Sequence, residues 1–244
     1  MQSWYSCTSS VINEFFLFFY QLLPTKCYAK TRSQERVVDV TCRLCKNNQE
    51  SVKHLISNCG SLVKSLYKTR HDNAFKCFIW PMLEMFDLVS KCPKWYSRDE
   101  VKPHYSKNGI NFYWDSPEYT GRDNESERPL RPDGKLVIDT STKKMIFLIE
   151  ITIPWIENRR EKYEHKCEKY KHILDSIKFE NPEFIVDQIT LVIDVFGGYG
   201  SDLIENISKI INDKETVATI IKNMQKSIIS SLVNLSRTFK IRCK

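Results

Sequence analysis

Four residues in the first quarter of the chain have the types and spacing of a metal site. Cys42 and Cys45 are separated by two residues, and His54 and Cys59 follow in the pattern C-x2-C-x8-H-x4-C. A C-x2-C pair places two thiolates on one tight turn, and a histidine with a third cysteine can complete a tetrahedral zinc site. Such a set leaves no open coordination position, which predicts a structural site rather than a catalytic one. The alternative is a coincidence of four unrelated residues in a cysteine-rich chain.

Two acidic residues form a second group with chemical potential. Asp133 follows Pro132 at the start of a strand-like segment, and Glu150 lies inside the apolar run MIFLIEITIPW. A glutamate among apolar residues needs a partner or a metal, because burying an unpaired charge is costly. If the two segments pair as a hairpin, the carboxylates face each other and favour a divalent cation, Mg²⁺ or Mn²⁺. Such a cation, held by acids and phosphate oxygens, supports phosphodiester hydrolysis. The alternative is a Glu150 without function at the sheet edge.

A lysine near the two acids would orient water and stabilise negative charge in the transition state. The charged segment 156–177 predicts a helix whose apolar stripe consists of Tyr163, Cys167, Tyr170 and Leu174. Lys166 flanks this stripe and is the lysine best placed to reach a phosphate, whereas Lys169 is expected to point further outward. Tyr170, one turn after Lys166, could support it. The alternative is that Lys166 belongs to an ordinary solvated face.

Other chemical motifs are weak in this sequence. His165 and His172 lie on the same expected helix, and a surface position is the simplest interpretation of both. No G-x-S-x-G elbow supports a Ser-His-Asp site. The run GGYG at 197–200 lacks the phosphate-loop and dinucleotide patterns, so it predicts a strand-to-helix turn.

The N-terminal segment has an apolar helical pattern. Residues 11–23 predict a buried amphipathic helix that ends at Pro24, and residues 24–41 are expected to be basic and irregular. The apolar core is too short to span a bilayer, and it lacks the basic region and cleavage site of a signal peptide. The abrupt start is expected of the tail of a longer protein.

The middle of the chain predicts one long helix followed by irregular structure. Residues 62–89 show helical spacing, which Pro81 is expected to kink or split. Residues 91–131 are rich in turn formers and predict a linker or a wrapping loop, with one strand-like segment at 110–115.

The C-terminal part alternates between strand and helix patterns, which predicts an α/β fold with a mixed sheet between helices. The expected strands are 135–139, 145–155 and 188–200, and the expected helices are 156–177, 201–211 and 214–238.

The composition fits a folded domain with an anionic partner without requiring one. The chain has 244 residues, 41% hydrophobic residues and a net charge of +7. Basic residues surround the cysteine–histidine cluster and fit a surface that faces phosphate groups, although solvated charge explains each of them equally well: Arg43, Lys46, Lys53 and Lys64.

The nine cysteines are an odd number, and three of them fall in the cluster, which favours metal binding over disulfides. A reducing compartment follows, the nucleus or the cytoplasm. The remaining cysteines are expected to be buried or bystander thiols: Cys7, Cys27, Cys77, Cys92, Cys167 and Cys243.

Several stretches together resemble the C-terminal region of the protein encoded by non-LTR retrotransposons of the restriction-like endonuclease type. These stretches are CRLCKNNQESVKHLISNC, YKTRHDNAFKCFIW, KWY, YWD, RPDGKLVID, FLIEITIPW and EHKCEKYKHIL. In this family a reverse transcriptase precedes a CCHC zinc knuckle and a PD-(D/E)xK-like nuclease whose lysine is displaced onto a helix. The resemblance runs from about residue 40 to the C-terminus, and its motifs are specific together but weak singly.

The resemblance implies a role for each matched residue and a function for the region. The knuckle ligands would be Cys42, Cys45, His54 and Cys59. The metal-binding acids would be Asp133 and Glu150, with Lys166 as the displaced lysine. The implied function is nicking of target DNA, so that the free 3′ end primes reverse transcription.

Three departures from the family pattern matter. The lysine expected two residues after Glu150 is replaced by Thr152, and the second acid, often Asp in the family, is Glu150 here. No Tyr/Phe-x-Asp-Asp polymerase signature occurs, so polymerase activity would require another part of the element.

The expected organisation is a restriction-like nuclease core preceded by a helical segment and a zinc knuckle. The segments are 1–41 (helical or linker), 42–60 (knuckle), 61–109 (helical linker) and 110–244 (nuclease). The leading hypothesis is a metal-dependent endonuclease that binds DNA, with RNA as a second candidate ligand. The alternatives are a non-catalytic nucleic-acid-binding remnant of such an element, or a folded relic without activity.

Overall fold

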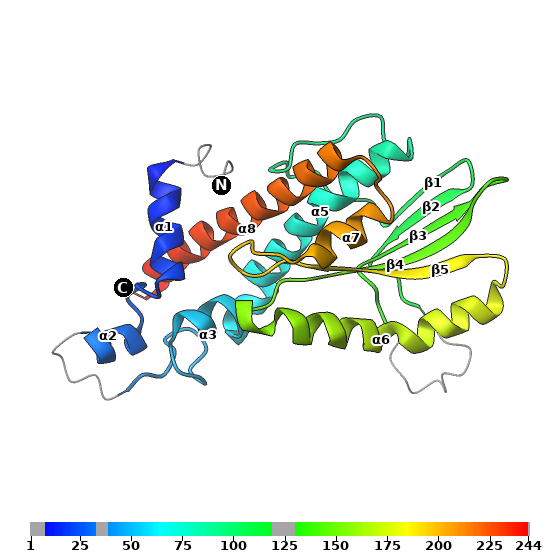
Figure 1. The fold of residues 1–244 in the computed structure, drawn as a ribbon. Helices are drawn as coiled ribbons and strands as arrows, with labels where there is room; N and C mark the ends of the chain where they lie inside the picture. The colour runs from blue at the N-terminus through cyan, green and yellow to red at the C-terminus, as the bar shows by residue number, and fades with distance from the viewer. Residues whose placement is uncertain (1–7, 33–38, 119–129, 244) are drawn as a thin grey trace.

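The centre of the protein is a mixed sheet of five strands in the order β1-β2-β3-β4-β5 (Figure 1). The computed structural model describes residues 8–32, 39–118 and 130–243. Neighbouring strands are antiparallel from β1 to β4, and β4 and β5 are parallel. Their bounds are β1 His104–Lys107, β2 Ile110–Trp114, β3 Gly134–Asp139, β4 Lys144–Thr152 and β5 Ile185–Val192. The predicted α/β fold with a mixed sheet flanked by helices is confirmed.

The parallel pair requires a crossover, and helix α6, Arg159–Glu180, supplies it after a short 3-10 turn. One face of α6 is buried through Tyr170, Ile173 and Ile177. These side chains pack on Ile146 and Leu148 of β4, so α6 covers this face of the sheet near β4 and β5. This packing holds the lysine-rich helix against the strand that carries Glu150.

Three helices cover the opposite face: α5 Lys68–Met85, α7 Ser201–Ser208 and α8 Lys214–Arg242 (Figure 1). They form one hydrophobic core with the sheet. Side chains from both predicted segments, 61–109 and 110–244, contribute to this core. Helix α5 runs unbroken through Pro81, which was expected to kink or split it. The lost backbone hydrogen bond is offset by burial of the neighbouring side chains Phe78, Ile79 and Met82.

The N-terminal part differs from the prediction in two places. Helix α1, Ser9–Phe19, ends well before Pro24 because Gln21 adopts a left-handed conformation with φ of 56°. Segment 24–41 contains helix α2, Lys26–Arg32, where irregular structure was expected. Residues 33–38 of that segment lie outside the described residues.

Two short helices follow α2, α3 Val52–Ser57 and α4 Gly60–Leu62, and a π-helical turn over Val63–Tyr67 then leads directly into α5. Side chains of α1, α3 and the end of α8 form a second core with Trp155 and Phe196. The N-terminal segment is therefore packed against the C-terminal helix and does not form a separate domain.

The segment 91–131 contains a hairpin of β1 and β2, of which the sequence indicated only the second strand. Residues 119–129 lie outside the described part of the chain. Strand β4 ends at Thr152, earlier than expected, and β5 ends at Val192, where the chain leaves the sheet for the turn before α7. Within the described ranges, no helix combines the length and the apolar character that crossing a bilayer requires.

Candidate functional site

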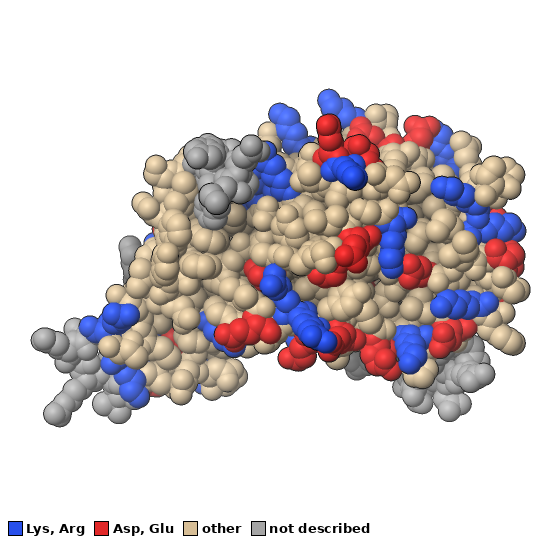
Figure 2. Space-filling model, viewed as in Figure 1, with Lys and Arg blue, Asp and Glu red and all other residues tan. Residues whose placement is uncertain are grey.

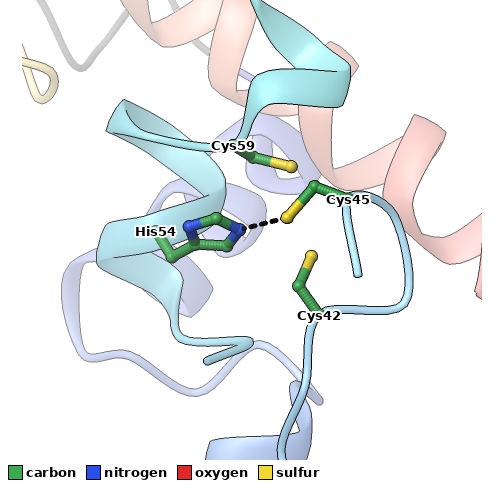
Figure 3. A group of neighbouring side chains, drawn as sticks. All are labelled: Cys42, Cys45, His54 and Cys59. Carbon is green, nitrogen blue, oxygen red and sulfur yellow. Dashed lines mark hydrogen bonds between the residues drawn. The ribbon is translucent and has the colours of Figure 1, made fainter. Parts of the chain in front are cut away.

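The structure brings Cys42, Cys45, His54 and Cys59 together. Their ligand atoms all lie within 4.8 Å of one another, and Cys45 Sγ is 3.3 Å from His54 Nε2 (Figure 3). A tetrahedral zinc site has Zn–S distances of about 2.3 Å and Zn–N distances of about 2.0–2.1 Å, which places its ligand atoms within about 4 Å of one another. The cluster can therefore bind a metal ion such as zinc.

Local backbone structure positions each of these four side chains. An isolated bridge between Thr41 and Gln49 closes the turn that carries the first two cysteines. Within this turn, Lys46 adopts a left-handed conformation with φ of 60°. The Ser51 side chain caps α3 by accepting a hydrogen bond from the His54 amide at 3.1 Å. These contacts orient the turn and α3 so that the four side chains converge.

The electrostatics of the cluster suit a bound cation. Burial lowers the pKa of His54, which keeps its imidazole neutral and able to bind a metal. Burial and the neighbouring Cys42 raise the pKa of Cys59 to about 12. The Cys59 thiol therefore resists ionisation unless a positive charge lies beside it. Burial acts in the same direction on Cys45, but hydrogen bonds from the Asn47 and Asn48 amides outweigh it and lower the Cys45 pKa. Three of the four donors are buried and Cys45 is half-buried, and a Cys3His set without an open position fits a structural metal site.

A buried ion pair, which the sequence did not indicate, ties the cluster to α8. The Glu50 carboxylate has no exposed surface and accepts hydrogen bonds from the Arg43 amide at 2.8 Å and the Arg43 guanidinium at 2.7 Å. Arg43 also donates to the Cys243 carbonyl at 2.6 Å and lies over the Phe239 ring. Arg43 is thus held in place by Glu50, Cys243 and Phe239 and is not a free surface cation.

The other basic residues near the cluster are more peripheral. Lys53 pairs with Glu157 at 3.2 Å and lies over the Trp155 ring. The Lys64 side chain lies outside what the structure describes. Of the remaining cysteines, those described are free thiols that are buried or half-buried, as expected, and Cys7 lies outside the described residues.

The structure also brings Asp133 and Glu150 together. Gly134 pairs with Ile149, so the antiparallel register places Asp133, one residue earlier, opposite Glu150. Asp133 Oδ2 accepts a hydrogen bond from the Ile151 amide at 2.9 Å. The hairpin that the sequence predicted therefore places the two acidic residues opposite each other on neighbouring segments.

Lys166 joins this acid pair from helix α6. Its ammonium donates a hydrogen bond to Glu150 Oε2, and it keeps 22% of its side-chain surface exposed. Glu150 itself is only 1% exposed, and its other oxygen, Oε1, is buried without a hydrogen-bond partner in the described structure. The Asp133 side chain is 21% exposed, so solvent reaches the site past Asp133 and Lys166.

The environments of the two acids drive their pKa values apart. Burial, followed by the charge of Asp133, raises the pKa of Glu150 to about 6, and Lys166 opposes this shift. Burial acts in the same direction on Asp133, but the hydrogen bond and charge of His71 outweigh it and lower the Asp133 pKa. A pair of carboxyl groups with different proton affinities is typical of catalytic sites, although structural ion pairs also produce it.

Tyr170 is fully buried beside the acid pair, and Lys169 lies over its ring. The Tyr170 hydroxyl donates to the Arg131 carbonyl at 2.8 Å, and its nearness to Glu150 helps to lower the Glu150 pKa. Lys169 donates to the same hydroxyl at 2.8 Å and lies 4.5 Å from the ring centroid. The expectation that Lys169 points outward is wrong, because its flexible stem folds back over the aromatic ring.

His71 on α5 is a member of the site to which the sequence assigned no role. Its Nε2 lies 3.2 Å from Asp133 Oδ2, and its Nδ1 lies 3.1 Å from Asp72 Oδ1. His71 falls within one of the stretches that carry the family resemblance, but its separation of 62 residues from Asp133 hid the contact. His165 and His172 are exposed on α6, as expected.

The charge of His71 predicts a pH-dependent contribution to stability. Burial opposes the imidazolium, but the two aspartates raise the pKa of His71 to about 9. Because this value lies above the unfolded value near 6.5, the stabilisation is fully present below about pH 6.5 and is lost as the pH rises through 9. We expect His71→Gln to lower the free energy of unfolding by about 1–2 kcal/mol at pH 6, allowing for partial exposure, and by little at pH 10. Urea unfolding at both pH values checks this, with exposed His165→Gln as the control. An equal loss at both would contradict it.

The acid pair offers fewer protein ligands to a metal ion than the cysteine–histidine cluster does. Among the described residues, that cluster is the one group of three or more metal-type ligands. A divalent cation at Asp133 and Glu150 would therefore complete its coordination with water and phosphate oxygens, as Mg²⁺ commonly does. Glu150 Oε1, which is buried without a hydrogen-bond partner in the described structure, would supply one ligand atom to such a cation.

Comparison with known proteins adds no relative. No protein-family model matches the chain, and no curated protein matches it significantly.

Proposed function

We propose that this chain is a divalent-metal-dependent DNA endonuclease with a PD-(D/E)xK restriction-like core, derived from the C-terminal region of a non-LTR retrotransposon protein. One observation carries the proposal. Asp133, just before β3, Glu150 on β4 and Lys166 on α6 converge, although they are spread over 34 residues of sequence. Lys166 thus reaches Glu150 from the helix in place of the lysine that is absent at Thr152.

Each residue has a distinct role in this proposal. Asp133 and Glu150 would hold Mg²⁺ or Mn²⁺, which activates water and neutralises charge on the scissile phosphate when bound. Lys166 would turn from Glu150 to a phosphate oxygen and stabilise the negative charge that develops during in-line attack. Tyr170 would position Lys169 at the rim of the site. In the parent element, the resulting nick would provide the 3′ end that primes reverse transcription.

The cysteine–histidine cluster would be a structural zinc knuckle that contacts DNA or RNA. The net charge of +7 supports a nucleic-acid partner. The positive charge is not gathered in one dense patch on the face shown in Figure 2, where basic and acidic residues alternate. Binding is therefore expected to be modest in strength and sensitive to salt.

One observation favours the second candidate, a non-catalytic nucleic-acid-binding module. Cations of the protein already occupy both acids, since Lys166 pairs with Glu150 and His71 pairs with Asp133. In a remnant that has lost catalysis, these pairs would be permanent. In a nuclease, a divalent cation and the DNA phosphate must displace them.

Substitution of Lys166 separates the two candidates. We expect Lys166→Ala to reduce metal-dependent nicking of supercoiled plasmid about 10²- to 10³-fold, the usual cost of losing one group that stabilises transition-state charge. DNA affinity should change little, because a single phosphate contact contributes little to binding. Gel electrophoresis of plasmid in Mn²⁺ measures the rate.

Lys171 on the exposed side of α6 provides the matched control, since Lys171→Ala removes the same charge away from the acids. Equal rates for Lys166→Ala and the wild type would remove Lys166 from the mechanism. A wild-type protein that binds DNA but does not nick it would favour the binding module.

A further inference from the structure

The Cys3His cluster and the acid pair are joined by a short series of direct contacts. The Cys59 amide donates to the Tyr67 hydroxyl at 2.9 Å, and this hydroxyl donates to the Leu55 carbonyl at 2.7 Å. Leu55 follows the ligand His54 in α3, and Cys59 is itself a ligand. One tyrosine hydroxyl therefore connects the backbone at both the third and the fourth metal-ligand positions.

Arg70 extends this connection into helix α5. Its guanidinium lies 5.1 Å from the Tyr67 ring centroid, and its NH1 donates to the Ile56 carbonyl at 3.1 Å. Arg70 is only 6% exposed, and its Nε has no hydrogen-bond partner in the described structure. A buried guanidinium is costly unless other groups compensate its charge, so the Ile56 carbonyl and the Tyr67 ring hold Arg70 in place at the start of α5.

The residue after Arg70 is His71, which reaches the acid pair. His71 Nε2 contacts Asp133 Oδ2, and the same oxygen accepts the Ile151 amide. The π-helical turn over Val63–Tyr67 sets the rotation of α5 and hence the direction in which His71 points. From Cys59 to Asp133 the path contains three contacts, Cys59–Tyr67, Tyr67–Arg70 and His71–Asp133, and one covalent step from Arg70 to His71.

We propose that Tyr67 and Arg70 are positioning residues that make the geometry of the Asp133–Glu150 site depend on metal occupancy of the Cys3His cluster. Zinc would fix α3 and the Cys59 turn, and Tyr67 and Arg70 would transmit this order to His71 and Asp133. The consequence for catalysis rests on the proposed nuclease function, whereas the structural coupling does not. The cluster would then regulate cutting as well as contact nucleic acid.

Hydrogen exchange tests the coupling without depending on nuclease activity. Because the Ile151 amide donates to Asp133 Oδ2, its exchange rate reports on the position of that carboxylate. We expect Tyr67→Phe, which removes only the hydroxyl, to retain zinc and to raise exchange at Ile151 about five- to ten-fold, the effect of one lost hydrogen bond. Chelation of zinc from the wild type should produce the same local change or a larger one.

The nicking assay then separates positioning from binding. We expect Tyr67→Phe to lower the single-turnover nicking rate roughly ten-fold, since small misplacement of a reacting group is costly, while its DNA dissociation constant stays within about two-fold. Thr69→Ala is the control, because the Thr69 hydroxyl bonds only within its own helical turn, to the Ser65 carbonyl at 2.6 Å. This variant should match the wild type in exchange at Ile151.

Each outcome decides the proposal. Unchanged exchange at Ile151 in zinc-loaded Tyr67→Phe would overturn the coupling. If Tyr67→Phe loses zinc, Arg70→Lys decides instead, because Arg70 hydrogen-bonds the Ile56 carbonyl and not the Cys59 backbone that Tyr67 holds. Unchanged exchange in Arg70→Lys would overturn the proposal. Faster exchange at Ile151 in a protein whose wild type does not nick DNA would uphold the coupling and reject the nuclease.

Discussion

Glu150→Gln and Asp133→Asn are each expected to reduce metal-dependent nicking at least about 10³-fold. Each substitution removes one of the two carboxylates available to a divalent cation at this site. Metal stabilisation of the transition state amounts to several kcal/mol, and each 1.36 kcal/mol corresponds to a factor of ten. Plasmid nicking in Mg²⁺ and in Mn²⁺ measures the effect, and Asp175→Asn on the exposed side of α6 is the control.

We expect Glu150→Gln to lose nicking activity without losing stability. The raised pKa of about 6, compared with about 4.5 unfolded, means that the ionised carboxylate destabilises the folded protein above about pH 6. A neutral glutamine of the same size avoids this cost. We expect Glu150→Gln to be equal to the wild type or more stable by up to about 2 kcal/mol at pH 8. The control at pH 4, where the carboxyl is protonated in both states, should show a smaller difference.

The result that would contradict this account is a Glu150→Gln protein that folds normally and nicks DNA at the wild-type rate. A destabilised and inactive Glu150→Gln protein would point to a structural ion pair with Lys166 in place of a metal site. The stability measurement is therefore needed beside the activity measurement.

Removal of metal from the Cys3His cluster is expected to produce the largest loss of stability. Cys42 and Cys59 lie in a core shared with α1 and α8, and Cys45 packs against it, so disorder there exposes apolar surface from both ends of the chain. Structural zinc contributes about 10–16 kcal/mol of apparent binding free energy in isolated fingers. If at least about 5 kcal/mol of this stabilises the domain, Cys45→Ser should lower Tm by about 10 °C or more.

Elemental analysis and thermal unfolding check this prediction together. The wild type should carry one zinc ion per chain, and Cys45→Ser should carry none. Cys92→Ser, which changes a half-buried thiol outside the cluster, should retain both zinc and Tm. Natively purified wild-type protein without zinc, yet with an unchanged Tm after chelation, would show that the four residues pack without a metal.

The sequence was sufficient to predict a site where the reactive residues and the hydrophobic pattern lie in the same short segment. The C-x2-C spacing predicted the cluster, and alternation around Asp133 and Glu150 predicted a hairpin that brings them together, because pairing register follows from a short turn. Lys166 was chosen from its angle to the apolar stripe of α6, and it does contact Glu150.

The sequence was insufficient where a contact joins distant segments or depends on a flexible side chain. His71 reaches Asp133 only because α5 packs under the sheet, and nothing local marks that contact. Arg43, which pairs with Glu50, donates a hydrogen bond to the Cys243 carbonyl at the end of α8, 200 residues away in the sequence. Strand β1 is short and polar, so its alternation is too weak to identify, and Lys169 is redirected by an aromatic ring that helical geometry does not anticipate.

The most direct test of the central claim is the rate at which the purified wild-type chain nicks supercoiled plasmid as Mg²⁺ or Mn²⁺ is titrated. Glu150→Gln, purified in parallel, serves to detect a contaminating nuclease. We expect nicking that rises with the cation concentration, disappears with chelator and is absent from Glu150→Gln. Salt-sensitive DNA binding without nicking at any cation concentration would contradict the nuclease and leave a nucleic-acid-binding module.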